Sequence, residues 1–337
     1  MRLPRSTIVA LVLLALAAAP ATARPGQGDA ARAEHQRIVN YWTAERMASA
    51  KPRDFVRTPT GFRAASPQKP PGGGGGGGGG STAVTGATWT KGGAVAQNVG
   101  KVFFRMGGSH YTCSGSVAQD SRGDMSLVLT AAHCAYDEVA RAFATEWMFI
   151  PAWGSQPATR TTACSSTLYG CWTAQALVVH RGYATAGSFN TEATVHDYAF
   201  AVVPAGGKSG DTHLDRTVGS YPISFVDLQA GWRAAAFGYP ASGKYKGNTL
   251  TYCAGPTITD VYNAHLTWGV GCDMTGGSSG GPWLKGLNES NGSGGTLSSL
   301  NSYGYSGIKN MYGPKFDNRT EAVYQRADSS TSNQIVP

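Results

Sequence analysis

The sequence predicts an all-β domain of two barrels, preceded by about ninety residues of a different character. From about Ala94 onward, short apolar or alternating runs recur, and Gly, Pro, Ser or Asn separates each run from the next. The runs have the length of strands, which is the pattern of an all-β sandwich or barrel. Only residues 316–327, FDNRTEAVYQRA, have a helical pattern, and they close the domain. Strand-sized pieces spread over roughly 240 residues fit one double-barrel domain.

Residues 1–23 have the pattern of a secretory signal peptide. Arg2 and Arg5 form a basic head, residues 8–19 are apolar, and residues 21–23, ATA, are a small-residue cleavage site. A membrane anchor is the alternative interpretation, but the apolar run is too short to span a bilayer comfortably. We therefore expect an exported chain, secreted to the extracellular side and soluble once the signal is removed.

Residues 24–71 are predicted to be a pro-segment, and residues 72–93 a Gly-rich linker. The linker contains nine consecutive glycines, 72–80, and such a run is too flexible to form a packed element. A basic disordered tail is the alternative interpretation. Before the glycines, Pro52 limits a predicted helix, and its apolar residues fall on one face: Ile38, Tyr41, Trp42 and Met47.

The remaining residues, 94–337, form the predicted domain. Its expected strands, in chain order, lie within 101–106, 126–134, 147–153, 174–180, 197–203, 234–240, 250–256, 265–270 and 296–305.

The charge distribution argues against a nucleic-acid partner. Residues 1–91 carry the whole net charge of +8, because they contain 12 Lys and Arg and only 4 Asp and Glu. The other 246 residues carry 16 of each sign, so the predicted domain is neutral. A nucleic-acid or membrane-surface protein would place its basic excess on the folded domain.

Six cysteines in an exported chain indicate three disulfides. Six cysteines allow 15 pairings, and the sequence alone does not select one. Pairing of nearest neighbours would join Cys113 to Cys134, Cys164 to Cys171 and Cys253 to Cys272. A metal site is disfavoured because no Cys-x-x-Cys pair or His cluster with ligand spacing occurs.

Three short blocks supply the groups needed for acyl transfer on a serine: LVLTAAHC with His133, HDYAFAVV with Asp197, and GGSSGGP with Ser279. The reaction needs a hydroxyl, an imidazole that takes its proton, a carboxylate that orients the imidazole, and backbone N–H donors. Each block alone could be structural: a core histidine, a strand cap or a glycine turn. Together they predict a catalytic triad.

The order of the blocks excludes two other hydrolase classes. GSSGG also matches the nucleophile elbow of α/β-hydrolases, but that fold needs a histidine after the serine, and the last histidine is His265. A subtilisin-like order needs an acid before His133. Asp120 and Asp124 are the candidates, but both lie in a polar turn.

The three blocks resemble the signature motifs of chymotrypsin-fold (trypsin-like) serine endopeptidases, over about residues 95–327. The chain looks most similar to the bacterial and fungal branch around the glutamyl endopeptidases. The resemblance implies two six-stranded antiparallel barrels with a C-terminal helix. CSGSVAQD resembles the strand that carries that family's histidine-loop disulfide, which supports Cys113–Cys134.

Carried over by motif, the resemblance makes Ser279 the nucleophile, His133 the general base and then acid, and Asp197 the orienting carboxylate. The N–H groups of Gly277 and Ser279 would form the oxyanion hole. Ser278 stands where animal trypsin-like enzymes have an acid that pairs with a new N-terminus. A serine cannot form that ion pair, so removal of the pro-segment would act by steric release.

The resemblance places Asp273 at the base of the primary specificity pocket, where a carboxylate would favour Arg or Lys substrates. A structural role beside Cys272 is the alternative. Asn301 occupies the place of the histidine linked to glutamate preference, which weakens the case for that preference. The residues that pair with substrate would be Ser302, Tyr303 and Gly304.

We therefore expect a secreted serine endopeptidase, made as a precursor, that acts on protein or peptide substrates as a monomer. The chemistry requires no metal or organic cofactor, and a calcium site stays open. The alternative from another class is a catalytically inactive, protease-like binding module.

Overall fold

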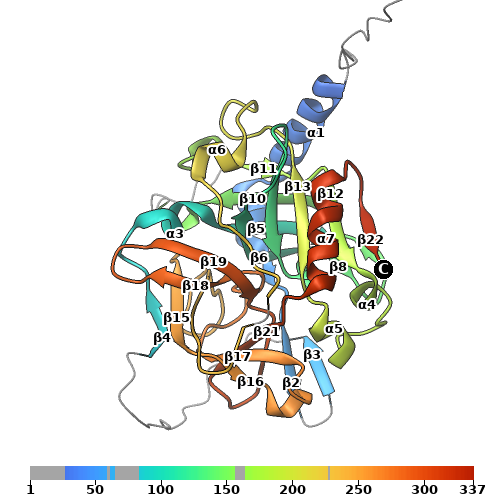
Figure 1. Ribbon diagram of the computed structural model, residues 1–337. Coiled ribbons are helices and arrows are strands. Elements are labelled where there is room, and N and C mark those ends of the chain that lie inside the picture. The colour runs from blue at the N-terminus through green and yellow to red at the C-terminus, as the bar shows by residue number, and fades with distance from the viewer. Residues whose placement is uncertain (1–26, 59–60, 65–82, 156–163, 227) are drawn as a thin grey trace, which may run out of the picture.

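The computed structural model describes residues 27–58, 61–64, 83–155, 164–226 and 228–337. The predicted signal peptide and the nine glycines lie outside the described residues. Figure 1 shows two β-rich halves, one above the other, with the predicted helix α7 (Asn318–Ser329) on one flank.

The first barrel is an antiparallel sheet in the order β10-β5-β6-β7-β13-β12. Its core is built from strands that are buried almost along their whole length, so they read as continuous apolar runs. Short β11 (Trp172–Thr173) extends it beside β10, and β22 (Gln334–Val336) pairs in parallel with β12. The bounds are β5 Val99–Met106, β6 Ser109–Ala118, β7 Ser126–Thr130, β10 Thr145–Pro151, β12 Ala176–His180 and β13 Ala199–Val203.

The second barrel consists of two sheets that meet where β15 packs beside β17 and β19 beside β21. One sheet has the order β19-β18-β14-β15-β4, and the other runs β16-β17-β21-β20. The bounds are β4 Val84–Thr88, β14 Arg233–Gly238, β15 Thr251–Pro256, β16 Ile258–Thr259, β17 Thr267–Gly271, β18 Pro282–Asn288, β19 Ser293–Leu300, β20 Tyr303–Tyr305 and β21 Asn310–Pro314. The predicted all-β class with two barrels and a late helix is confirmed.

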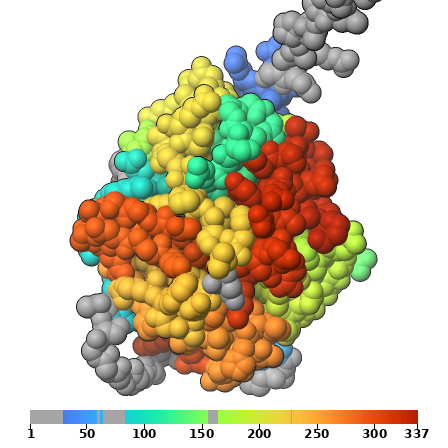
Figure 2. All heavy atoms as spheres, in the orientation of Figure 1, coloured from blue at the N-terminus to red at the C-terminus, as the bar shows by residue number. Residues whose placement is uncertain are grey.

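Short helices in the connections were not predicted from the sequence. They have four to six residues each, too few for a 3.6-residue apolar period to emerge: α3 Gly93–Asn98, α4 Arg181–Ala184, α5 Thr191–Val195 and α6 Leu214–Val218. The predicted helix begins after the N-cap Asp317, whose carboxylate accepts from the backbone of Arg319 and Thr320. The strand β22 follows this helix in the sequence. Figure 2 shows the red C-terminal part on the flank opposite the orange β18–β19 hairpin.

The disulfides follow the nearest-neighbour pattern: Cys113–Cys134, Cys164–Cys171 and Cys253–Cys272. The first joins β6 to the turn that carries His133, and the third joins β15 to the end of β17.

The stretch 27–64, which we call the N-terminal segment, packs across both barrels with its described residues, 27–58 and 61–64. The expected single helix is two helices, α1 (Gln27–Tyr41) and α2 (Ala44–Ser49), because Thr43 leaves helical geometry and caps α2. Trp42 is buried, and its indole N–H donates to the Glu146 carbonyl at 2.6 Å. Three short strands follow: β1 Lys51–Pro52, β2 Phe55–Thr58 and β3 Gly61–Ala64. In Figure 1 the blue segment runs from α1 at one end of the molecule to β2 and β3 at the other.

The predicted linker 72–93 extends too far toward the domain. Residues 84–88 form β4, which pairs with β15 in the second barrel. The next residue, Trp89, is buried, and its backbone N–H donates to the Leu250 carbonyl at 2.8 Å. The domain therefore begins before residue 94; VTGAT is a weak strand pattern that gains its stability from pairing with β15. Across the described part of the chain, no helix is both long and apolar enough to cross a membrane.

Candidate active site

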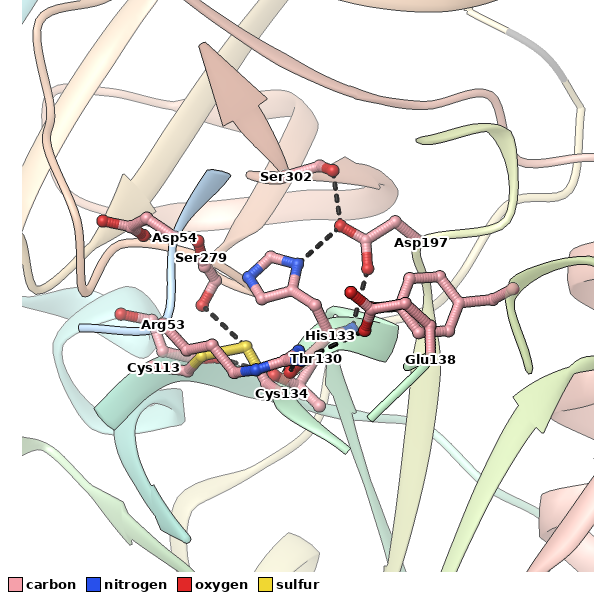
Figure 3. A network of polar contacts seen from close by, with 12 residues as sticks. Arg53, Asp54, Cys113, Thr130, His133, Cys134, Glu138, Asp197, Ser279 and Ser302 are labelled. Atoms are coloured by element: carbon pink, nitrogen blue, oxygen red, sulfur yellow. Dashed lines mark hydrogen bonds and ion pairs between the residues drawn. A yellow bond between two sulfur atoms is a disulfide. The ribbon is translucent and has the colours of Figure 1, made fainter. Parts of the chain in front are cut away.

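His133 and Asp197 meet at one end of the first barrel (Figure 3). His133 lies in a 3-10 turn directly after β7, and Asp197 lies just before β13. Because β7 and β13 are paired with Ala199 opposite Thr130, these two positions come together. The imidazole Nδ1 is 2.7 Å from the Asp197 Oδ2, and the His133 backbone N–H donates to Oδ1 at 2.9 Å.

The Asp197 carboxylate is fully buried and is held by donors on several sides. Besides His133, the Ser302 hydroxyl donates to its Oδ2 from the start of the second barrel's β20 region. Hydrogen bonds to the charged form compensate for the burial of a carboxylate. The bond to Asp197 favours the His133 tautomer with the proton on Nδ1, which leaves Nε2 unprotonated and able to accept a proton.

Ser279 lies in a closely packed glycine loop between β17 and β18. Gly277 has φ +95°, and a Cβ there would lie 2.8 Å from the Tyr239 carbonyl oxygen, so only glycine fits. The Ser278 hydroxyl turns away and donates to the Thr275 carbonyl at 2.8 Å. Behind the loop, the buried Asn301 amide donates to the Ser278 carbonyl at 3.0 Å. Asn301 therefore supports the loop.

The Ser279 hydroxyl donates to the carboxylate of Asp54, which comes from the N-terminal segment. The distance from Oγ to Asp54 Oδ1 is 2.9 Å, and the Gly277 N–H approaches the same oxygen at 3.3 Å. Among the described residues, His133 Nε2 has no hydrogen-bond partner. An acidic oxygen thus occupies the position between the hydroxyl and the backbone donor. Burial of this carboxyl raises the pKa of Asp54, and its bond to Ser279 opposes that shift.

The N-terminal segment crosses the site with a defined chain direction. On one side of Asp54, β1 runs parallel to β6, with Pro52 opposite Thr112. On the other side, β2 runs parallel to β20, with Phe55 opposite Tyr303 and Val56 opposite Gly304. The segment therefore bridges the two barrels over Ser279.

Aromatic contacts hold the second half of this crossing. The Phe55 ring stacks on Phe189 at a centroid distance of 4.0 Å and packs edge-on against His133 at 5.4 Å. Phe62 packs edge-on against Phe189 and Tyr303. Stacked and edge-on ring pairs each add stabilisation beyond buried area.

Two of the residues predicted to contact substrate make other contacts. The Asp273 carboxylate binds Lys244 Nζ at 2.7 Å and the Tyr245 hydroxyl at 2.5 Å. Its charge is thus already paired within the domain. The Tyr303 hydroxyl points inward to Asp260 at 2.6 Å, while its backbone, like that of Gly304, faces β2.

Sequence reasoning missed Asp54, because no motif marks a single acid in a basic segment. It also missed Glu138, a buried acid in the connection after His133. Within the described residues, the side chains of Cys113, His133 and Cys134 are close enough to suggest a metal site. Both sulfurs are in one disulfide, so no thiolate is available there.

Comparisons with known proteins give two solved structures of substantial sequence identity. A protease named Anisep from Arthrobacter nicotinovorans is 36% identical over 69% of this chain and 96% of its own, with a TM-score of 0.57. A thermostable serine protease, AL20, from an extremophilic microorganism is 33% identical over 70% of this chain and 99% of its own, with a TM-score of 0.58. A Glu endopeptidase is 20% identical over 68% and 90% of the two chains, with a TM-score of 0.49. No protein-family model and no curated protein sequence matched the chain.

Proposed function

Because this chain belongs to the chymotrypsin-fold family of serine proteases, we propose that it is an endopeptidase that forms an acyl-enzyme on Ser279. The observation that carries the proposal is the buried His133–Asp197 pair beside a serine in a closely packed glycine loop. Peptide and protein substrates follow from the family.

In the proposed reaction, Ser279 Oγ gives its proton to His133 Nε2 and attacks the peptide carbonyl carbon. The negative charge on the carbonyl oxygen is stabilised by the N–H groups of Gly277 and Ser279. His133 then protonates the leaving amine, and the acyl group stays on Ser279. A water molecule, deprotonated by His133, releases the acyl group by the same steps. Asp197 keeps the imidazole oriented and stabilises its protonated form.

We further propose that the chain is made as a latent precursor whose pro-segment comprises residues 24–71. The Asp54 carboxylate competes for the two groups that catalysis needs, the Ser279 hydroxyl and the Gly277 N–H. On either side of Asp54 the segment also covers the site, because Phe55 packs against His133 and Arg53 pairs with Glu138. Its removal would free Ser279 to bond His133, without any new N-terminal ion pair at Ser278.

Residues 1–23 are proposed to direct export, after which the enzyme works outside the cell. Three disulfides are consistent with an oxidising compartment.

A fluorophosphonate probe, which reacts with an activated serine, tests both proposals. The full chain would carry a specific cleavage site in place of part of the glycine run 72–80, so that the folded protein can be cut and the segment separated. We expect slow labelling before the cut and rapid labelling after it, with Ser279→Ala unlabelled in both states.

Peptide hydrolysis should appear together with labelling. A folded, cut chain that neither reacts with the probe nor cleaves any peptide would be the inactive binding module instead. Equal labelling before and after the cut, with peptide hydrolysis in both states, would refute latency but not the endopeptidase.

A further inference from the structure

We propose that the Glu138 carboxylate and the His133 carbonyl oxygen form a subsite that binds the guanidinium of a substrate arginine next to the scissile bond, with the Tyr183 hydroxyl bonded to the carboxylate from behind. The proposal rests on the endopeptidase function and adds a preference to it. In the structure Arg53 of the N-terminal segment occupies this subsite.

The contacts of Arg53 define the subsite. Its Nη2 lies 3.0 Å from Glu138 Oε2, and its Nη1 donates to the His133 carbonyl oxygen. The Tyr183 hydroxyl donates to the same Glu138 oxygen at 2.8 Å. A planar guanidinium can bond the Glu138 carboxylate and the His133 carbonyl at once, so it fits these two acceptors better than an ammonium does.

Glu138 and Tyr183 belong to the body of the domain, whereas Arg53 does not. The Glu138 side chain is only 2% exposed with Arg53 in place, and Arg53 itself is 11% exposed. When the segment leaves, the remaining described partner of Glu138 is the Tyr183 hydroxyl. Burial raises the pKa of Tyr183, so this hydroxyl stays a donor and brings no positive charge. A recessed carboxylate with one neutral donor favours a new cation.

The position of Arg53 indicates which substrate residue would reach this carboxylate. In Figure 3, Arg53 lies beside His133, and its neighbour Asp54 lies at Ser279. The residue before it, Pro52, pairs with Thr112 of β6, and the Arg53 N–H approaches the Thr112 carbonyl at 3.5 Å.

The acyl part of a substrate is expected to lie along Tyr303 and Gly304, on the far side of Ser279. The Arg53 side therefore receives the leaving group. We expect the strongest preference at the first residue after the cut.

Glu138 could instead serve only to anchor the segment in the precursor. In that case the cut enzyme would show no preference for basic residues. Substrate selection by the separated enzyme therefore distinguishes the two roles, whereas segment binding alone does not.

The test uses the full chain, folded, cut in the glycine run and freed of its segment, with active sites counted by the fluorophosphonate probe. Quenched fluorescent peptides differ only at the first residue after the cut: Arg, Lys, Gln or norleucine. We expect kcat/KM per active site to be about ten-fold or more higher for Arg than for norleucine. Glu138→Gln should bring that ratio close to one, and Tyr183→Phe, which keeps the carboxylate, should retain most of it.

An equal rate for Arg and norleucine in the parent enzyme would overturn the subsite, and so would an Arg preference that survives Glu138→Gln. Either result would leave the endopeptidase intact, because hydrolysis would still be observed. Absence of probe labelling and of hydrolysis of every peptide would overturn the proposed function and this inference with it. The norleucine peptide is the matched control, since it keeps length and apolar area without charge.

Discussion

Asp54 of the N-terminal segment hydrogen-bonds Ser279, the proposed nucleophile. Its carboxylate accepts from Ser279 and lies near the Gly277 N–H. Hydrogen bonds to charged acceptors contribute about 1.5–3 kcal/mol each. The proposed latent state should therefore depend heavily on one side chain.

Asp54→Ala should raise the rate of fluorophosphonate labelling in the uncut chain by about ten-fold or more, because it removes both bonds without shortening the segment. Asp29→Ala, at an exposed position in α1, is the matched control. An uncut Asp54→Ala chain that labels as slowly as its parent would show that steric cover alone maintains latency.

The raised pKa of Asp54 predicts that a free peptide of residues 50–58 inhibits better as the pH falls. The docked carboxyl holds its proton more tightly than the free one, so docking takes up a proton. As the pH falls from the raised pKa of the docked carboxyl to the ordinary pKa near 3.8, binding strengthens. Below that pH the affinity levels off. The measurement is inhibition of probe labelling in the cut enzyme across pH, for the natural peptide and for its Asp54→Asn analogue.

The Asn analogue cannot titrate, so the difference between the two peptides isolates Asp54 from His133, which also faces it. Identical pH profiles would refute the link between docking and protonation.

Ser278 is expected to have a modest structural role. Ser278→Ala removes its bond to the Thr275 carbonyl, a loss of about 1 kcal/mol in the free energy of unfolding. Labelling of the cut enzyme should stay within a few-fold of the parent. Loss of all labelling in a folded Ser278→Ala protein would contradict this modest role and show that catalysis needs the Ser278 hydroxyl.

Among single residues, the sequence identified the groups that short motifs mark. It missed the groups that only the fold brings close to Ser279 and His133. His133, Asp197 and Ser279 each lie in a block with a recognisable order. Asp54 lies 225 positions from Ser279, and no local pattern reports a contact over that separation. Asp273 shows the reverse: its motif position suggests a pocket, but Lys244 and Tyr245 hold its carboxylate.

Among the elements, α1 and α2 anchor the N-terminal segment, and β1 and β2 position it. Trp42 is 2% exposed, packs on Phe103 and bonds the Glu146 carbonyl. The anchor lies on the first barrel, whereas β2 pairs with the second. Docking of the helices therefore delivers Asp54 to Ser279 at the junction.

Trp42→Ala should weaken this anchor by about 3–5 kcal/mol, the usual loss for a buried tryptophan. The uncut chain should then label faster, and protease digestion should cut the segment at lower protease concentration. Gln36→Ala, at an exposed position on α1, is the control and should change neither. If the segment of Trp42→Ala is digested more readily but labelling is unchanged, docking of the helices does not control access to Ser279.

The strands with long apolar runs were predictable because their composition is uniform. The strand β2 was not, since it has only four residues and its partner β20, which lies within the predicted run 296–305, is 248 positions away. Their parallel direction follows from the order in which the segment meets the two barrels. β4 was missed for a similar reason: its glycine and threonines do not resemble a buried strand until β15 pairs with it.

In the whole molecule, the sequence predicted the two-barrel class and the late helix. It did not predict that the N-terminal segment is a packed layer. The glycine run at 72–80 marks where the segment and the domain separate in the sequence. The packing depends on few apolar residues among many basic ones, and so the composition suggested a tail as well.

Two histidines predict how the stability of the whole molecule depends on pH. His180, at the end of β12, and His196, after α5, stack with ring centroids 4.0 Å apart and are both buried. Burial lowers the pKa of each to about 4. Between about pH 6.5 and 4 the unfolded chain binds protons that the folded histidines do not. The free energy of unfolding should therefore fall on acidification, by about 1.4 kcal/mol per unit of pKa shift.

The measurement is urea unfolding of Ser279→Ala, which cannot digest itself, at pH values from 7 to 4. Asp120 opposes the trend, since burial raises its pKa to about 6 and folding there takes up a proton. The contribution of the two histidines is isolated by comparing how the free energy of unfolding changes with pH in Ser279→Ala and in the same protein with His180→Phe and His196→Phe. This comparison does not depend on the absolute stability of either protein. Removal of the pair should make the slope flatter or reverse it. Equal slopes would mean that the stacked histidines titrate alike in the folded and unfolded chains, which contradicts their burial between β12, α4 and α5.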